Sequence, residues 1–213
     1  MWAGRACACQ LPCPGRQQLN AFGRHTAWAL RLALGAAQVK AWAEDGSAVA
    51  QSGHHRARVN CLLAAVAAQT PPAGRPPEQQ ATPPVLLASG SVDGTIFAWR
   101  DAQGTAAIGE AGGTQLKHPQ QAKGVTSLLE VEGCLWAGTA DGKVLVWGQG
   151  ADEIGGAWQV CHVFSNHAEQ VSCLAAVGRQ VLSGSADRTI VCYDAATLDM
   201  IYTIPDQGQW EQW

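Results

Sequence analysis

The sequence predicts an all-β chain built from repeated four-stranded units. Three segments share one design, an apolar stretch, an aspartate turn and a second apolar stretch ending in an aromatic residue: Ser89–Trp99, Ala137–Trp147 and Ser183–Tyr193. The turn aspartates recur at intervals of 48 and 46 residues, close to the ~40–45 residues of a unit with four short strands. Both faces of the stretch Thr95–Trp99 are apolar, which predicts a strand buried on both sides.

Each unit opens with a second matching stretch that follows a histidine. These stretches are Val59–Leu63, Val125–Leu129 and Val171–Ala175, and their histidines are His55, His118 and His167. Glycine follows the turn aspartate at Gly94 and Gly142 and supplies the positive φ that a tight hairpin needs. A more diverged earlier copy ends at Val39–Trp42. The expected order in a unit is therefore short strand, apolar strand, turn, apolar strand and edge strand.

Composition divides the chain into three parts. Residues 1–26 contain no acidic residue and are expected to be a disordered or leader segment, residues 27–204 the folded array, and residues 205–213 a tail or the truncated start of a further unit. Residues 69–84 hold six of the ten prolines and are expected to be a solvated loop insertion. An Arg-rich, acid-poor start is also typical of a transit peptide, but serine is absent before Ser47, so organelle import is the minor alternative.

Charge and cysteine usage exclude several classes of protein. The net charge of −3 argues against a nucleic-acid partner, since domains that bind nucleic acids are usually strongly basic. No apolar run approaches the ~18 residues of a membrane span. Five of the eight cysteines are scattered through apolar segments, which indicates free thiols and an intracellular location, in the cytoplasm or nucleus.

The segments resemble WD40 repeats over roughly residues 37–204. The resemblance rests on Gly53-His54-His55, on Ser89–Gly94 and on Trp99-Arg100-Asp101. It implies a partial WD40-type β-propeller with about three complete four-stranded blades and one partial blade. The run from Val39 to Trp99 and the later Ser183-Gly-Ser-Ala-Asp-Arg-Thr-Ile are also similar to a plant and green-alga subfamily that joins a CCCH zinc finger to a WD40 domain.

The resemblance further implies structural hydrogen-bonded tetrads of histidine, serine, aspartate and an aromatic residue. The first repeat has His55, Ser89, Asp93 and Trp99. The middle repeat keeps His118, at a shifted position, with Asp141 and Trp147, but has Ala137 in place of serine. The last repeat has His167, Ser183 and Asp187, with Tyr193 in place of tryptophan. Because these sets recur once per repeat, they are interpreted as structural and not as a catalytic triad.

No other motif points to chemistry. Cys7, Cys9, Cys13 and His25 are the one candidate metal cluster, but the gap to His25 is too long for a CCCH finger, so no metal site is expected. Gly138–Val144 resembles a phosphate-binding loop but has valine where the hydroxyl residue belongs. No catalytic residue and no cofactor are expected.

The sequence therefore predicts a non-enzymatic WD40 scaffold that mediates protein–protein interactions as part of a larger complex. One alternative is an RNA-associated regulator of the zinc-finger/WD40 type, and a less favoured one is a propeller hydrolase. Closed propellers have ~4–8 blades, so the chain is expected to be a fragment, a part that pairs with another propeller fragment, or a four-bladed ring. The identity of the protein partners is not encoded in any motif.

Overall fold

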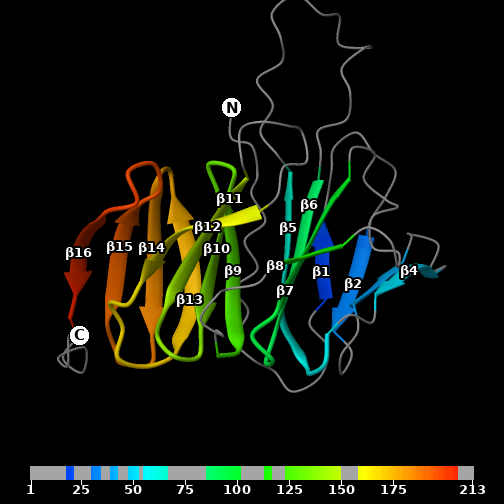
Figure 1. Cartoon of the computed structure of the whole chain (residues 1–213), viewed down its shortest axis with the longest axis horizontal. Helices are drawn as coiled ribbons and strands as arrows, with labels where there is room; N and C mark the ends of the chain where they lie inside the picture. Colours follow the sequence, from blue (N-terminus) through cyan, green and yellow to red (C-terminus); the bar gives the residue numbers. More distant parts are fainter. Residues whose placement is uncertain are drawn as a thin grey trace, which may run out of the picture.

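The computed structural model is all-β throughout the residues that it describes, which are 18–21, 30–34, 39–42, 48–52, 55–66, 85–101, 113–116, 123–149 and 158–205. Sixteen strands form four four-stranded antiparallel sheets. The strands of each sheet follow one another in chain order (Figure 1). Among the described residues there is no helix long and apolar enough to cross a lipid bilayer.

The first two sheets are formed by the amino-terminal half of the chain. The first sheet contains β1 (Gln18–Ala21), β2 (Leu30–Leu34), β3 (Val39–Trp42) and β4 (Ala48–Ser52). The second sheet contains β5 (Val59–Val66), β6 (Val85–Ser91), β7 (Ile96–Asp101) and β8 (Thr114–Leu116).

The last two sheets repeat the same order. The third sheet contains β9 (Val125–Val131), β10 (Cys134–Thr139), β11 (Val144–Gln149) and β12 (Trp158–Phe164). The fourth sheet contains β13 (Val171–Val177), β14 (Gln180–Ser185), β15 (Ile190–Asp194) and β16 (Met200–Ile204).

The first sheet differs from the sequence-based expectation in its extent. The sequence indicated a partial unit after residue 26, whereas the sheet has four strands and its strand β1 lies within residues 1–26. β1 pairs with β2 from Gln18 opposite Ala33 to Ala21 opposite Leu30. The segment Gln-Leu-Asn-Ala has too few apolar positions to predict a strand from its side chains. It forms a strand because its backbone groups pair with those of β2. The insertion 69–84 lies outside the described residues, as do residues 1–17 and 206–213.

Neighbouring sheets pack face to face, with their first strands closest together. β5 contacts β9 and β9 contacts β13, so the sheets stand side by side in chain order, from the first sheet at one end of Figure 1 to the fourth at the other. This arrangement buries both faces of a sheet that lies between two others, as the apolar residues on both faces of Ile96–Trp99 predicted.

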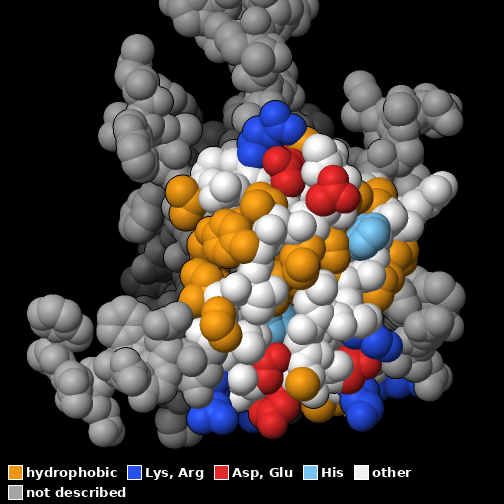
Figure 2. Space-filling view, turned by 90° about the vertical axis from the view of Figure 1, so that its left-hand side faces the viewer, with side chains coloured by type: hydrophobic (Ala, Val, Ile, Leu, Met, Phe, Trp, Pro, Cys, Tyr) orange, Lys and Arg blue, Asp and Glu red, His pale blue; other side chains and the backbone are white. Residues whose placement is uncertain are grey.

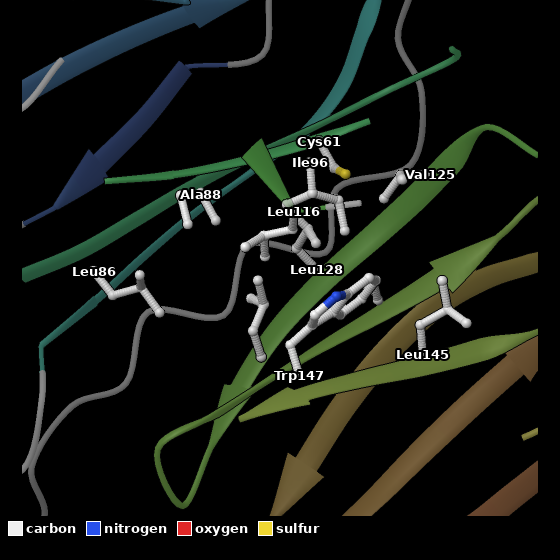
Figure 3. Close-up of a cluster of buried hydrophobic side chains, with 12 residues drawn as sticks. Cys61, Leu86, Ala88, Ile96, Leu116, Val125, Leu128, Leu145 and Trp147 are labelled. Atoms are coloured by element: carbon white, nitrogen blue, oxygen red, sulfur yellow. The ribbon is translucent and has the colours of Figure 1, made fainter. Parts of the chain in front are cut away.

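The hydrophobic core consists of layers between the sheets. Figure 3 shows the layer between the second and third sheets, where Ile96 and Leu116 face Leu128 and Trp147. A second layer, between the third and fourth sheets, contains Trp136, Phe164 and Tyr193 in mutual ring contact. Both layers are largely apolar, so the sheets on their two sides stabilise one another by burying these side chains.

Two glycines let the sheets approach closely. A Cβ atom on Gly90 would lie 2.5 Å from Val125, the first residue of β9, and a Cβ atom on Gly138 would lie 2.6 Å from Val171, the first residue of β13. Such distances are well inside van der Waals contact. The glycine of the Ser-Gly-Ser or Ala-Gly-Thr segment is therefore the site where the next sheet docks.

Candidate functional site

Three hairpin turns lie at the same end of the second, third and fourth sheets. They join the two middle strands of each sheet and contain Asp93, Asp141 and Asp187. Each turn is bonded to the segment that enters the first strand of its own sheet. The amide groups of Val92, Ala140 and Ala186 donate to the carbonyl oxygens of Arg58, Gly124 and Gln170. We call this surface the turn rim and define it as residues 55–58, 91–95, 123–124, 139–143, 167–170 and 185–189.

A chain of polar side chains holds the rim on the fourth sheet. Nε2 of the buried His167 lies 2.7 Å from Oγ of Ser183, and Nδ1 lies 3.1 Å from Oδ2 of Asp187. The Ser183 oxygen lies 3.3 Å from the hydroxyl oxygen of Tyr193. The structure thus brings all four residues that the sequence singled out in this repeat into one continuous set. Tyr193 can therefore take the place of tryptophan in this set, since its hydroxyl group reaches Ser183.

The second sheet has the same polar residues, but its aromatic residue does not hydrogen-bond to the serine. Nε2 of His55 lies 2.7 Å from Oγ of Ser89, and Nδ1 lies 2.8 Å from Oγ1 of Thr95, which in turn donates to Asp93. The indole nitrogen of Trp99 is buried without a hydrogen-bond partner among the described residues. A Cβ atom on Gly113 would lie 2.5 Å from that nitrogen, so the indole N–H faces Gly113. The resemblance implied that the Trp99 indole would bond to Ser89 and complete the tetrad, and the structure does not show this bond.

The set is incomplete on the third sheet. Ala137 occupies the serine position and has no side chain that can hydrogen-bond, while His118 lies outside the described residues. Asp141 is held instead by the Thr139 hydroxyl, at 2.7 Å, and by Nζ of Lys143, at 3.3 Å. The indole nitrogen of Trp147 is buried and unpaired among the described residues. Asp141 and Trp147 are thus in the same sheet but do not form one polar set.

Threonine is a member of the polar set that the sequence reasoning missed. Oγ1 of Thr189 lies 2.9 Å from Nδ1 of His167 and donates to Asp187 at 2.6 Å. Thr95 has the same position in the second sheet. The signal was present in the sequence, because Asp-x-Thr-Ile occurs at both turns, whereas Lys143 replaces the threonine in the turn that lacks the set.

The turn aspartates are stabilised as carboxylates. Burial opposes ionisation of Asp187, but the hydroxyl and amide of Thr189, the amide of Ala168 and His167 hold its pKa well below the usual range. The pKa of Asp93 is lowered in the same way, against its burial, by Thr95, the Arg56 amide and the nearby His55. These carboxylates have a structural role, because the groups that donate to them belong to the turn and to the segment that enters the first strand of the sheet.

The remaining reactive side chains of the described residues include a buried thiol and no cluster that could hold a metal ion. Burial raises the pKa of the Cys61 thiol to about 12, which keeps it protonated and unreactive. In the described part of the chain, no three His, Cys, Asp or Glu side chains gather closely enough to hold a metal ion. The cluster Cys7, Cys9, Cys13 and His25, which the sequence considered and did not favour as a metal site, lies outside the described residues.

The outward side of the turn rim is the candidate functional surface. Its frame is repeated from sheet to sheet, but its exposed side chains differ. Four of these side chains are cationic and one, Glu169, is acidic; the cationic residues are Arg56, Arg58, Lys123 and Arg188. The three partly buried turn aspartates also carry negative charge at the rim, and Lys143 pairs with one of them, Asp141. The exposed side chains of the rim, taken alone, carry more positive than negative charge.

Comparison with known proteins matches this geometry. Residues 158–194 match the family model "WD domain, G-beta repeat". The chain is 34% identical over 80 residues to Zinc finger CCCH domain-containing protein 62 of Arabidopsis thaliana, covering 38% of this chain and 19% of that protein. It is 31% identical over 80 residues to Zinc finger CCCH domain-containing protein 59 of the same plant, covering 38% and 17%. These matches agree with the resemblance to the zinc-finger/WD40 subfamily.

A solved structure matches over most of the chain. It is a chain of the "Crystal Structure of Mitotic Checkpoint Complex", with a TM-score of 0.60 and 19% identity, covering 84% of this chain and 48% of that one. The present chain thus spans about half of that chain and less than a fifth of either plant relative. Residues 158–194 are a WD40 repeat, and the chain has the fold of a WD40-type β-propeller with four four-stranded sheets.

Proposed function

We propose that this protein is a non-enzymatic scaffold whose turn rim binds acidic segments of protein partners. The supporting observation is that the rim pairs a rigid, repeated frame with exposed side chains that do not repeat. A propeller-like fold with WD40 repeats is typical of protein-interaction scaffolds, although a fold alone does not define a function.

The frame favours binding because little of it has to be ordered when a partner arrives. At the second sheet, the amides of Arg56 and Thr95 both donate to Asp93, at 2.8 Å each. At the fourth sheet, the amides of Ala168 and Thr189 donate to Asp187, at 2.9 Å each. A preorganised surface loses less conformational entropy on binding and so retains more of its contact energy as affinity.

The same polar groups argue against hydrolysis by this surface. His167 and Ser183 are buried, and His167 is bonded to both Asp187 and Thr189. His55 and Ser89 repeat the arrangement in the second sheet. A serine nucleophile has to meet substrate in an open cleft beside oxyanion donors, whereas these hydroxyls lie inside the sheets. Within the described residues they are framework groups, and the proposal therefore assigns no enzymatic role.

The test is affinity capture from cells with a charge-reversed rim. The double variant Arg56→Glu and Arg58→Glu changes two exposed side chains whose rim contacts to Asp93 and Val92 are made by the backbone. The matched control is Arg179→Glu, another exposed cation, in the turn between β13 and β14 at the other end of the fourth sheet. We expect the rim variant to lose a defined set of protein partners that the wild type and Arg179→Glu both retain.

Ribonuclease treatment distinguishes the scaffold from the alternative, an RNA-associated role. The names of the two plant relatives favour an RNA-associated role as the second candidate. Partners that persist after ribonuclease treatment support the scaffold, and partners lost with the RNA favour the alternative. Capture that is unchanged by the rim variant would contradict the proposal. We also propose that the protein acts inside cells, since the five described cysteines are free thiols.

A further inference from the structure

The outer face of the fourth sheet is an apolar surface with no neighbouring sheet among the described residues. We call it the end face and define it by the apolar residues that alternate outward along the four strands: Cys173, Ala175, Val177, Leu182, Ile190, Cys192, Tyr202 and Ile204. The polar Gln180, paired with Val177, lies at its edge. Figure 2 views the molecule from this side. Hydrophobic side chains gather in the middle of the view, and acidic and basic side chains lie toward its top and bottom.

The end face has the same design as the face that the third sheet packs against the fourth. In the shared register Val177, Ile190 and Ile204 correspond to Val131, Val144 and Phe164. In the third sheet these residues are 0%, 0% and 5% exposed, and in the fourth sheet 67%, 42% and 38% exposed. The residue types are equally apolar, so the difference is the missing neighbour. An apolar surface of this kind marks an interaction site.

Two smaller features of the inter-sheet contacts also recur on the end face. Gly184 matches Gly90 and Gly138, but a Cβ atom on it would meet only Cys173 of its own sheet, whereas the other two would meet a valine of the following sheet. Ser172 matches Asn60 and Thr126, whose side chains donate to the carbonyl oxygens of Val125 and Val171. Ser172 is exposed. The end face thus presents a notch and a hydroxyl group where a neighbouring strand would bind.

We infer that the end face binds the first sheet of a second copy of this chain. That sheet lies at the opposite end of the molecule in Figure 1 and has the same strand order and antiparallel pairing. It contacts the second sheet through β1 and β2. Two end-face contacts, related by a two-fold axis, would close a ring of eight sheets, within the ~4–8 blades of closed propellers.

Continuity supports a second copy as the occupant, because the end face continues the two inter-sheet contacts of the molecule with the same register. This inference does not rest on the turn rim, of whose exposed cations only Arg188 adjoins the end face.

One corner of the end face departs from the repeat. Arg188 takes the position of Gly142, and a Cβ atom on Gly142 would lie 2.5 Å from the carbonyl oxygen of His167 in the next sheet. The docked sheet therefore approaches less closely at this turn than the fourth sheet approaches the third. The contact is centred on the strands, with Ile190 in β15 and Ile204 in β16.

The test is sedimentation velocity of the full chain over a concentration series. We expect a monomer–dimer equilibrium without larger species, because a closed ring satisfies both end faces. Ile190→Lys is expected to raise the dissociation constant about tenfold or more, since it places a charge in an apolar contact. The matched control is Val92→Lys, because Val92 is 45% exposed, close to the 42% of Ile190, but lies on the turn rim. Its dissociation constant should equal that of the wild type.

Thiol labelling of the unmodified chain tests the same face without a substitution. Cys173 lies on the end face, and Cys161, which is also exposed, lies in β12 of the third sheet. Labelling of Cys173, located by peptide mass mapping, should slow as the dimer forms, while labelling of Cys161 should not change. A chain that stays monomeric, or a dimer insensitive to Ile190→Lys, overturns the inference. A disulfide between the two Cys173 residues, or open-ended polymers, would overturn the closed ring.

Discussion

The third and fourth sheets have the same topology, but they are held in different ways. The third sheet lies between two others and buries its apolar residues on both faces, with Leu135 and Leu145 toward the second sheet and Trp136 and Val146 toward the fourth. Within the described part of the chain, the fourth sheet is covered on one face only. It keeps the full set of His167, Ser183, Asp187 and Tyr193, whereas the third sheet has no serine at the matching position, Ala137.

The comparison teaches that apolar packing and the buried polar set are two separate ways to hold the same hairpin. The covered third sheet retains its turn with an ion pair and a threonine contact, since two neighbouring sheets fix its strands. The fourth sheet has one neighbour and relies on hydrogen bonds that link the entry segment, the two middle strands and the turn. The two sheets should therefore respond oppositely to loss of apolar and of polar groups.

The largest expected effect is the loss of the central aromatic residue between the two sheets. Trp136→Ala removes a fully buried side chain that stacks on Phe164 with ring centroids 5.8 Å apart and also meets Tyr193. It should lower the free energy of unfolding by about 3–5 kcal/mol. Urea denaturation measures the change. Leu182→Ala, at the matching half-buried position of the fourth sheet, is the control and should cost much less.

A matched pair of valines isolates the effect of the neighbouring sheet. Val131→Ala removes two methyl groups from a completely buried site and should cost about 2–3 kcal/mol. Val177→Ala makes the same change on the end face, where it should cost less than about 0.5 kcal/mol at a concentration at which the chain is monomeric. Equal losses in chemical denaturation would mean that burial by the next sheet is not what distinguishes the two positions.

Loss of the turn carboxylate should affect the fourth sheet through its polar set. Asp187→Ala leaves His167, Thr189 and the Ala168 amide without their shared acceptor and should cost about 1–2 kcal/mol at neutral pH. Because the folded-state pKa of Asp187 is lowered, its stabilising contribution is present above the unfolded value of about 3.9 and is lost as the pH falls below it. Thermal melts should therefore show the gap between wild type and variant narrowing below about pH 4.

The last expected effect is a small gain in stability at the turn of the fourth sheet. Arg188 has a φ of 67°, whereas the matching turns have Gly94 and Gly142, each with a φ of 80°. Arg188→Gly relieves the strain of a left-handed non-glycine residue and should raise stability by about 0.5–1 kcal/mol. The reciprocal change Gly142→Ala should destabilise, because the new Cβ atom meets the backbone of residues 167 and 169. A differential scanning calorimetry trace that shows no gain for Arg188→Gly would contradict this account.

Most members of the polar set could be predicted from the sequence, but the hydrogen bond between the aromatic residue and the serine could not. The positions of His167, Ser183, Asp187 and Tyr193 follow from the repeat, and the structure brings them together. The indole of Trp99 occupies the same strand position as Tyr193 but faces Gly113. Side-chain length and the local space at the edge strand decide whether an aromatic residue reaches the serine, and neither is visible in a pattern of residue types.

The sequence by itself determined the four-stranded repeat, the positions of the turns and the strands that are apolar on both faces. These features depend on local chemistry, namely the positive φ of Gly94 and Gly142 and the alternation of side chains along a strand. Only the tertiary structure decided which of two equally apolar positions is buried. Val131 and Val177 are the same residue at the same register, and the presence or absence of a neighbouring sheet makes one of them core and the other surface.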